Sequence, residues 1–345
     1  MEKNECPASS LLLLGQPLIV RNIRIAIGEL EIKTIMIPER FRPAIKLIQD
    51  NFPLLDIQEY NDEDTKGHNG ADTKSDSRHE VDNDTITNSN NGTALTGRIK
   101  LSGSEEFLQM PLNVVLHHTR SSPSSNPRSI SMDSLVYPWD FLNITYKILH
   151  EEITGTRIST NASVASSSII HGPCLIEDDV TIDDFCKIKG PCFISKGSFV
   201  GMGSLVRECM IGNNTCIGFN CEIGKSYFSG DDKIAHHNVI LDSLIGQNVW
   251  FGGYSGTANV LLNRKNIKYD IGDRRLIDTG TDHFGAVVGN NCAVGASVII
   301  LPGRELQRNT VIQAGTVVGK KLSSEEIYLG KNDRALEITP TANIT

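Results

Sequence analysis

Two adjacent histidines and a group of basic residues fall within one stretch of the chain and could act together. His236 and His237 are followed by an asparagine and five basic residues: Asn259, Arg264, Lys265, Lys268, Arg274 and Arg275. A neutral imidazole near pH 7 can take a proton from an attacking nucleophile. A local cluster of cations can hold a phosphate group. This stretch therefore suits a small phosphorylated ligand, with a histidine nearby as a candidate base.

The overall charge excludes several classes of partner. The chain has 345 residues, with 33 Lys and Arg against 41 Asp and Glu, and a formal net charge of −8. Such a chain lacks the broad positive surface that binds nucleic acid or an anionic membrane. No segment approaches the roughly 20 apolar residues of a membrane span, and the N-terminus lacks the basic start and apolar run of a signal peptide. We expect a cytoplasmic protein without nucleic-acid or membrane partners.

From about residue 168 the chain follows a six-residue repeat. Aliphatic residues recur at this spacing in two runs: Ile170, Ile176, Ile182, Ile188, Ile194, Val200 and Val206, continued after a one-residue slip by Ile211, Ile217 and Ile223, and then Val288, Val294, Ile300, Leu306, Ile312 and Val318. Period six fits neither a helix nor simple strand alternation. It suits a triangular coil with an inward aliphatic residue on each short face. The repeat therefore predicts the left-handed parallel β-helix of hexapeptide-repeat proteins.

The same repeat accounts for most of the cysteines. Five of the eight occupy its small inward site: Cys174, Cys186, Cys192, Cys221 and Cys292. No C-x-x-C pair occurs, so we expect packed, reduced thiols and no metal site. The repeat is interrupted from Ser226 to about Phe284, the stretch that holds the histidines and the basic group. In a repetitive scaffold, such an interruption is where a functional site can be built.

The first half of the chain has a different character. Residues 1–59 alternate strand-like and helix-like runs, among them TIMIP, RFRPAIKLIQDNF and PLLDIQEY, and predict a small α/β unit with parallel strands. Residues 60–98 are almost free of large apolar side chains, so we expect disorder. Residues 99–155 complete this part and end in a predicted helix, YPWDFLNITYKILHEEI, with Pro138 in its first turn. The β-helix then covers 156–322, and 323–345 form a tail.

Motifs in the interrupted stretch resemble a known family. KIAH is followed by VILDSLIG, GTAN, RLIDTG and GAVVGNN. Over about residues 137–320 the chain resembles the acetyltransferase half of the bifunctional N-acetylglucosamine-1-phosphate uridyltransferase/glucosamine-1-phosphate acetyltransferases, most closely the archaeal sugar-1-phosphate nucleotidyltransferase versions. The resemblance implies a homotrimer that transfers an acetyl group from acetyl-CoA to the amine of an amino-sugar 1-phosphate, in nucleotide-sugar biosynthesis.

The resemblance also implies roles for single residues. His236 would be the general base, a role typically worth ~10²–10⁴-fold in rate, and Asn259 of GTAN would orient the amine and the thioester. Lys265, six residues after Asn259, Arg207 of SLVRE and Lys225 would hold the sugar phosphate. The pantetheine arm of acetyl-CoA would pass three small residues of later coils: Gly253, Ala296 and Ala314.

The sequence departs from the family at three places. The family has a tyrosine three residues after the base, where this chain has Val239, and its basic run before the last motif is replaced by Thr281, Asp282 and His283. Gly224 stands where bacterial members have a phosphate-binding lysine. These departures leave another amino-sugar acceptor open. They also leave open a non-catalytic trimeric scaffold or regulator of a full-length paralogue.

The front half resembles part of a Rossmann-like sugar nucleotidyltransferase domain. GQPLIVRNIRIAIGELEIKTIMIPERFRPAIKLIQDNFP is similar to its second element, and YPWDFLN to the stretch that closes it. Nucleotidyl transfer needs a glycine-rich phosphate loop and a carboxylate-held Mg²⁺, but Leu11–Leu14 run directly into Gly15. We expect a degenerate remnant. A UDP-N-acetylglucosamine pyrophosphorylase-like activity stays the alternative, and Mg²⁺ is expected only if this half is active.

Overall fold

The computed structural model describes residues 137–272 and 275–323 in full, and the backbone of short strands outside these ranges. It forms two compact units, Met1–Leu11 with Gln16–Leu135, and Leu12–Gly15 with Val136–Thr345. The strands before residue 137 are β1 (Leu12–Leu13), β2 (Gln16–Pro17), β3 (Ile32–Pro38), β4 (Asp56–Tyr60), β5 (Thr96–Leu101), β6 (Phe107–Pro111), β7 (Val114–His118) and β8 (Ile130–Ser134).

In the first unit, strands β4, β3, β5 and β6 form one sheet in that order. β3 and β4 pair in parallel, as the sequence predicts, while β5 runs antiparallel to both β3 and β6. The helix expected around RFRPAIKLIQDNF, the start of the chain where a phosphate loop would lie, most of 60–98 and nearly all of the tail fall outside the described residues.

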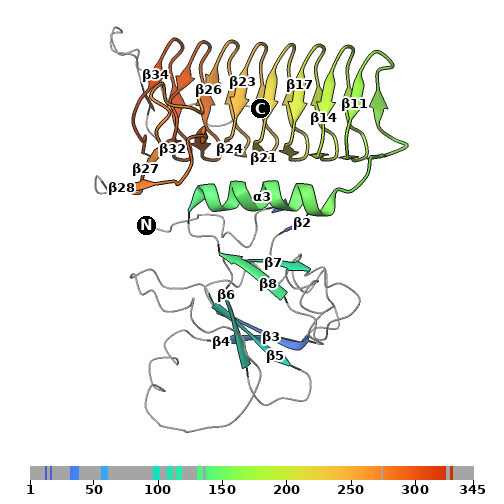
Figure 1. The fold of residues 1–345 in the computed structure, drawn as a ribbon, viewed down its shortest axis with the longest axis vertical. Helices are drawn as coiled ribbons and strands as arrows, with labels where there is room; N and C mark the ends of the chain where they lie inside the picture. Colours follow the sequence, from blue (N-terminus) through green and yellow to red (C-terminus); the bar gives the residue numbers. More distant parts are fainter. Residues whose placement is uncertain are drawn as a thin grey trace. The chain divides into compact units, whose positions relative to one another are not determined.

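The second unit is a parallel β-helix whose chain passes through three sheets in turn (Figure 1), here named faces I, II and III. Face I contains β9 (Arg157–Ile158), β12 (Cys174–Ile176), β15 (Cys192–Ile194), β18 (Met210–Ile211), β21 (Tyr227–Gly230), β24 (Leu244–Gln247), β29 (Ala286–Val288) and β32 (Arg304–Leu306). Face II contains β10 (Ser163–Val164), β13 (Thr181–Ile182), β16 (Phe199–Val200), β19 (Cys216–Ile217), β22 (Lys233–Ile234), β25 (Trp250–Phe251), β30 (Ala293–Val294), β33 (Val311–Ile312) and β35 (Ile327–Tyr328). Face III contains β11 (Ile169–His171), β14 (Lys187–Lys189), β17 (Leu205–Arg207), β20 (Glu222–Gly224), β23 (Val239–Leu241), β26 (Gly256–Thr257), β31 (Ile299–Ile300) and β34 (Val317–Val318). The parallel β-helix that the six-residue repeat predicts is confirmed.

The repeat supplies the core of this unit. Every aliphatic residue of the two predicted runs is buried except Ile170, which packs partly buried against the same core. The five cysteines of the small inward site are buried and free, and Cys209, which the one-residue slip hides from the pattern, joins them. Burial raises the pKa of Cys209 to about 12 and that of Cys292 to about 11. The thiols of Cys209 and Cys292 therefore stay protonated and unreactive at neutral pH.

The corners of the coil use residues that tolerate a positive φ. Between faces I and II the turn residues include Asn214, Asp231, Asn248, Asn291 and Asn309, with φ from 53° to 59°. Asparagine and aspartate adopt this left-handed conformation more readily than other non-glycine residues. Their side chains also bond from coil to coil, as Asn248 Nδ2 does to Asn291 Oδ1 at 2.9 Å.

Helix α3 (Pro138–Glu152) runs along the corner between faces III and I (Figure 1). Its start and its proline agree with the sequence prediction, and the Asp140 carboxylate accepts the N–H of Tyr137 at 2.8 Å. Trp139 packs edge-on against Tyr269 and Phe284, with ring centroids 5.5 and 6.1 Å away. Tyr269 belongs to a hairpin, β27 (Lys268–Asp270) and β28 (Leu276–Asp278), inserted at this corner. Within the described chain, no helix is long and apolar enough to cross a membrane.

Candidate functional site

His236 lies at the corner between faces II and III, just after β22 and just before β23. Its side chain is exposed, and its Nδ1 accepts the backbone N–H of Phe219, in the preceding coil, at 3.2 Å. A neutral imidazole that accepts at Nδ1 carries its proton on Nε2. In this arrangement Nε2 of His236 is a hydrogen-bond donor.

A buried asparagine that the sequence analysis did not single out holds the backbone of His236. Asn238 is fully buried, and its Nδ2 donates to the carbonyls of Ala235 at 2.8 Å and His236 at 3.3 Å. Its Oδ1 accepts the N–H of Ser255 at 3.1 Å, so the amide uses both donors and its acceptor. The available signal was an amide at the inward site four residues after Ile234, where other coils place cysteine or serine.

The predicted cofactor-binding residues continue the row of His236 along the same corner. The N–H groups of Tyr254, Ser297 and Gly315 donate to the carbonyls of His236, Gly253 and Ala296, at 3.0, 2.9 and 2.8 Å. Gly253, Ala296 and Ala314 therefore occupy the positions equivalent to His236 in the following coils. Ala296 and Ala314 are exposed, so small side chains leave a low surface beyond the histidine.

Aromatic rings border this row. The ring of His237 stacks on Tyr254 at 4.8 Å and 18°, and Phe219 meets it edge-on at 5.1 Å. Tyr254 is 66% exposed although its φ is +60°. A large side chain in that conformation costs about 1–2 kcal/mol relative to an ordinary backbone. The rings of Phe219, His237 and Tyr254 thus form an aromatic surface beside His236.

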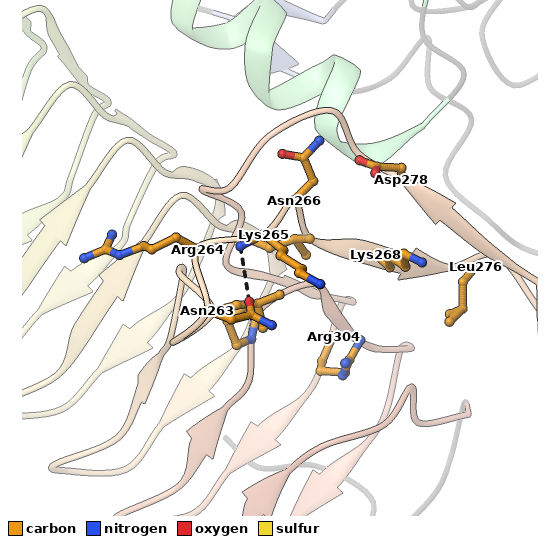
Figure 2. A pocket seen from close by; sticks show the side chains of 11 residues that line it. Asn263, Arg264, Lys265, Asn266, Lys268, Leu276, Asp278 and Arg304 are labelled. Atoms are coloured by element: carbon orange, nitrogen blue, oxygen red, sulfur yellow. Dashed lines mark hydrogen bonds between the residues drawn. The ribbon is translucent and has the colours of Figure 1, made fainter.

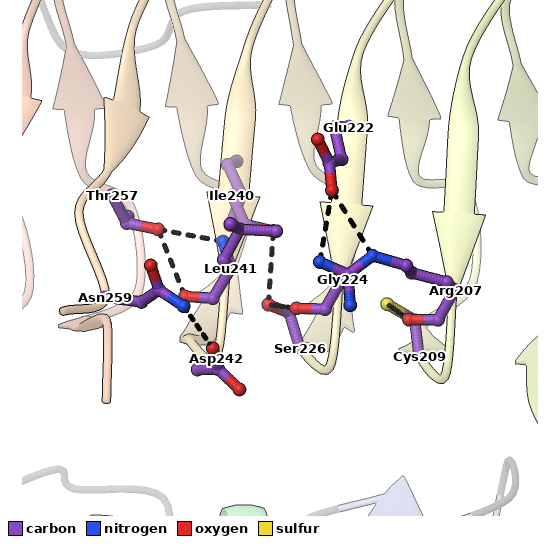
Figure 3. A network of polar contacts seen from close by, with 10 residues as sticks. All are labelled: Arg207, Cys209, Glu222, Gly224, Ser226, Ile240, Leu241, Asp242, Thr257 and Asn259. Atoms are coloured by element: carbon purple, nitrogen blue, oxygen red, sulfur yellow. Dashed lines mark hydrogen bonds and ion pairs between the residues drawn. The ribbon is translucent and has the colours of Figure 1, made fainter. Parts of the chain in front are cut away.

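Another corner, between faces III and I, carries the predicted substrate residues Arg207 and Lys225 and the predicted catalytic residue Asn259 (Figure 3 shows Arg207 and Asn259). They lie along this corner in different coils, at the ends of β17, β20 and β26. The Asn259 Nδ2 donates to Asp242 Oδ2 at 2.5 Å. The Lys225 Nζ lies 5.3 Å from the ring centre of Tyr146 on α3, whose hydroxyl donates to Glu208 at 2.6 Å. Burial and the neighbouring Glu208 carboxylate raise the pKa of Tyr146 to about 12, so it remains a neutral donor.

Face III separates the two groups of predicted residues. β23 has three residues, with His236 just before it and Asp242 just after it. A strand advances about 3.3 Å per residue, so the two corners lie roughly 10 Å apart across this face. Within one chain the structure does not bring His236 into contact with Asn259, Arg207 or Lys225.

Lys265 lies in a cavity of about 590 Å³ at the inserted loop (Figure 2). The lining comes from the loop, the hairpin and the following coil: Leu261, Asn263, Arg264, Lys265, Asn266, Ile267, Lys268, Leu276, Asp278, Pro302 and Arg304. Lys265, Lys268 and Arg304 border the same space, whereas Arg264 points away from it (Figure 2). Among the described residues, neither Lys265 nor Lys268 has an ion-pair partner. Asp278, opposite Lys268 in the register of the hairpin, is the one carboxylate of the described lining, against four basic residues, so the lining carries a net positive charge.

The other residues of the basic stretch stand apart from this cavity. His283 is exposed and bonds to its neighbour Asp282 at 2.7 Å, an interaction that lowers the pKa of that carboxyl. Arg275 is exposed at the hairpin turn, and Arg274 lies outside the described residues. Within residues 137–272 and 275–323, no group of three His, Cys, Asp or Glu side chains could hold a metal ion.

No protein-family model matches the chain. It is 32% identical over 197 residues to the bifunctional protein GlmU of Methanococcus aeolicus, a match that covers 57% of this chain and 46% of the relative. It is 34% identical over 209 residues to the GlmU of Methanococcus maripaludis, covering 60% and 49%. Among solved structures, a UDP-N-acetylglucosamine acyltransferase from Campylobacter jejuni aligns with 12% identity and a TM-score of 0.28, over 48% of this chain and 68% of the other.

The resemblance to the archaeal bifunctional proteins is thus confirmed over the matched residues. The chain spans about half the length of the curated relatives it matches.

Proposed function

We propose that this chain transfers an acetyl group from acetyl-CoA to the amine of an amino-sugar 1-phosphate. One observation supports this most: His236 stands exposed at the head of a row of small residues, Gly253, Ala296 and Ala314, on one corner of the coil. A long thin molecule such as the pantetheine arm can lie on such a row and present its thioester at the histidine. The similarity to the bifunctional GlmU proteins supports the same reaction class.

In the proposed reaction the acceptor nitrogen attacks the thioester carbonyl carbon and the amine proton passes to a base. The C–S bond then breaks, CoA leaves as the thiolate, and the proton is returned to its sulfur to give the free thiol. His236 is that base if Nε2 is free to accept. The hydrogen bond from the Phe219 N–H to Nδ1 opposes this, because it keeps the proton of the neutral ring on Nε2. The ring must therefore turn away from Phe219 when the acceptor binds. Asn238 keeps the backbone of His236 in place while the ring moves.

The acceptor phosphate would bind in the cationic cavity, at Lys265 together with Lys268 and Arg304. In an amino-sugar 1-phosphate, four covalent bonds separate the amine nitrogen from the phosphorus, so the two atoms are at most ~5 Å apart. Face III, roughly 10 Å wide, separates the backbone of His236 from the corner that carries the cavity. Among the described residues no hydrogen bond or ion pair joins them: His236 bonds to Phe219, and the cavity is lined by the loop, the hairpin and the following coil. We infer that the site is completed between copies, His236 from one subunit and the cavity from another, in the homotrimer that the family resemblance implies.

Thiol release from acetyl-CoA with glucosamine-1-phosphate, and then galactosamine-1-phosphate, tests the proposal. We expect turnover by the wild type and a fall of about 10²–10⁴-fold in His236→Ala, the range of a general base. His283→Ala is the matched control, because it also removes an exposed histidine of the interrupted stretch but should keep full turnover. Equal rates of thiol release in His236→Ala and the wild type would show that His236 is not the general base. Absence of turnover with both sugars, despite acetyl-CoA binding, would refute the acceptor class.

A further inference from the structure

The side chain of Arg207 lies flat across the neighbouring strand of face III. Arg207, Gly224 and Leu241 are in register on β17, β20 and β23. A Cβ atom at Gly224 would stand 2.7 Å from the Arg207 Cζ and 2.9 Å from its Nη2. Side-chain atoms do not approach that closely, so the guanidinium occupies the space that only a glycine leaves open. Any larger residue at 224 would displace it.

In this position Arg207 is paired with a carboxylate of the same strand as Gly224 (Figure 3). Its Nε and Nη2 donate to Glu222 Oε1 at 3.2 and 3.1 Å. The Glu222 side chain is 39% exposed and that of Arg207 26% exposed, so solvent reaches the pair only in part. In the register of face III, Glu222 is flanked by Leu205 and Val239, neither of which is charged. The positive charge of Arg207 is thus largely offset where it stands.

Lys225, the other cation of this corner, also has a partner, whereas the lysines of the cavity form no ion pair in the described part of the chain. The Lys225 ammonium stands over the Tyr146 ring of α3, a cation–π contact. Lys265 and Lys268, in contrast, form no ion pair within 4 Å among the described residues, although Asp278 lies opposite Lys268 in the hairpin and lines the same cavity. The free energy of anion binding is most favourable at cations whose charge is not already offset by a carboxylate.

We propose that Gly224 and Glu222 set acceptor specificity by holding the Arg207 side chain flat against face III. This end of the face then contacts a neutral, hydroxyl-bearing part of the acceptor. The anionic group of the acceptor binds only in the cavity of Lys265, Lys268 and Arg304. The proposal rests on the acyl-transfer function given above. It reassigns Arg207 from phosphate ligand to partner of Glu222. Glu222 Oε1 holds the arginine, which leaves Oε2 to accept a hydroxyl from the sugar.

Binding of inorganic phosphate to the full chain, followed by calorimetry, tests this without requiring turnover. Lys268→Gln should weaken binding about tenfold, the equivalent of one charge-assisted hydrogen bond. Arg207→Gln should change the Kd by less than about twofold, as expected of an already neutralised surface charge. Lys189→Gln is the matched control, because Lys189 is the exposed cation in register beside Arg207 and has no part in the proposal.

Two variants should release Arg207 by independent routes. Glu222→Gln removes the opposing charge, and Gly224→Ala displaces the guanidinium. Either should create new phosphate affinity that disappears when Arg207→Gln is added. An Arg207→Gln variant that loses as much affinity as Lys268→Gln, or a wild type that binds no phosphate, would overturn the proposal. If phosphate binding follows the expected pattern but thiol release is absent in the wild type, the acyl-transfer function fails and the assignment of the anion site stands.

Discussion

Asp232 is a fully buried carboxyl at the start of β22, in the same coil as His236. Its Oδ1 accepts the N–H of Val249 at 2.8 Å and its Oδ2 that of Gly230 at 3.3 Å. Burial nevertheless dominates and raises its pKa from 3.8 to about 8, with Asp231 adding a like charge. The folded chain therefore holds this proton at neutral pH, whereas the unfolded chain releases it near pH 4.

This difference predicts how stability depends on pH. Between about pH 4 and pH 8 the folded state binds one more proton than the unfolded state at this residue, so the free energy of unfolding falls as pH rises, by about 1.4 kcal/mol per pH unit. Asp232→Asn keeps an acceptor for Val249 but cannot titrate. Urea unfolding at pH 5 and pH 7.5 should show the wild type losing several kcal/mol relative to Asp232→Asn. Parallel pH profiles for the two proteins would mean that Asp232 is already ionised in the fold.

At the scale of elements, α3 and the inserted hairpin depend on one aromatic cluster. Trp139 of α3 is 7% exposed and packs with Tyr269, Phe284 and the buried Ile267. Tyr269 lies next to Lys268, one of the cations of the cavity. The cluster therefore fixes the position of Lys268 in the cavity and also holds α3 against the coil.

Trp139→Ala should destabilise this part of the molecule by about 3–5 kcal/mol, the usual cost of removing a buried tryptophan. We expect hydrogen exchange to accelerate in the hairpin, around Lys268–Asp278, while strands at the other end of the coil, such as β12, keep their protection. Phosphate affinity should fall together with this protection. Phe185→Ala is the control, because that ring is 70% exposed at a corner. Uniform loss of protection along the coil would show that the cluster acts globally.

The elements differ in how far they could be predicted. The coil follows from its repeat because each strand pairs with its equivalent one turn later, so the spacing that places Ile217 and Ile234 inward also aligns His236, Gly253 and Ala296. The Arg207–Glu222 pair could not be predicted, because it depends on the space above Gly224 and on the direction of one long side chain. The predicted interruption from Ser226 was wrong, because β21 to β26 continue the three faces of the coil and the insertion lies only between β26 and β29. The hairpin in this insertion was missed because no periodicity marks its stretch.

At the scale of the whole molecule, the proposed site needs more than one chain. His236 and the cavity of Lys265 and Lys268 lie at different corners, separated by face III. A closed trimer repeats the same contact three times, and each contact can join the histidine corner of one subunit to the loop of its neighbour. The same arrangement would make activity depend on protein concentration.

Co-expression of two inactive variants tests whether the site is shared. His236→Ala lacks the base, and Lys265→Ala/Lys268→Ala lacks the proposed anion site. In mixed trimers a site is intact only when its histidine comes from the second variant and its loop from the first. With random assembly this leaves about a quarter of the sites, so thiol release should recover to about a quarter of the wild-type rate, whereas a site contained in one chain recovers none. Co-expression of His236→Ala with His236→Gln is the control and should stay inactive, since every histidine corner is then defective.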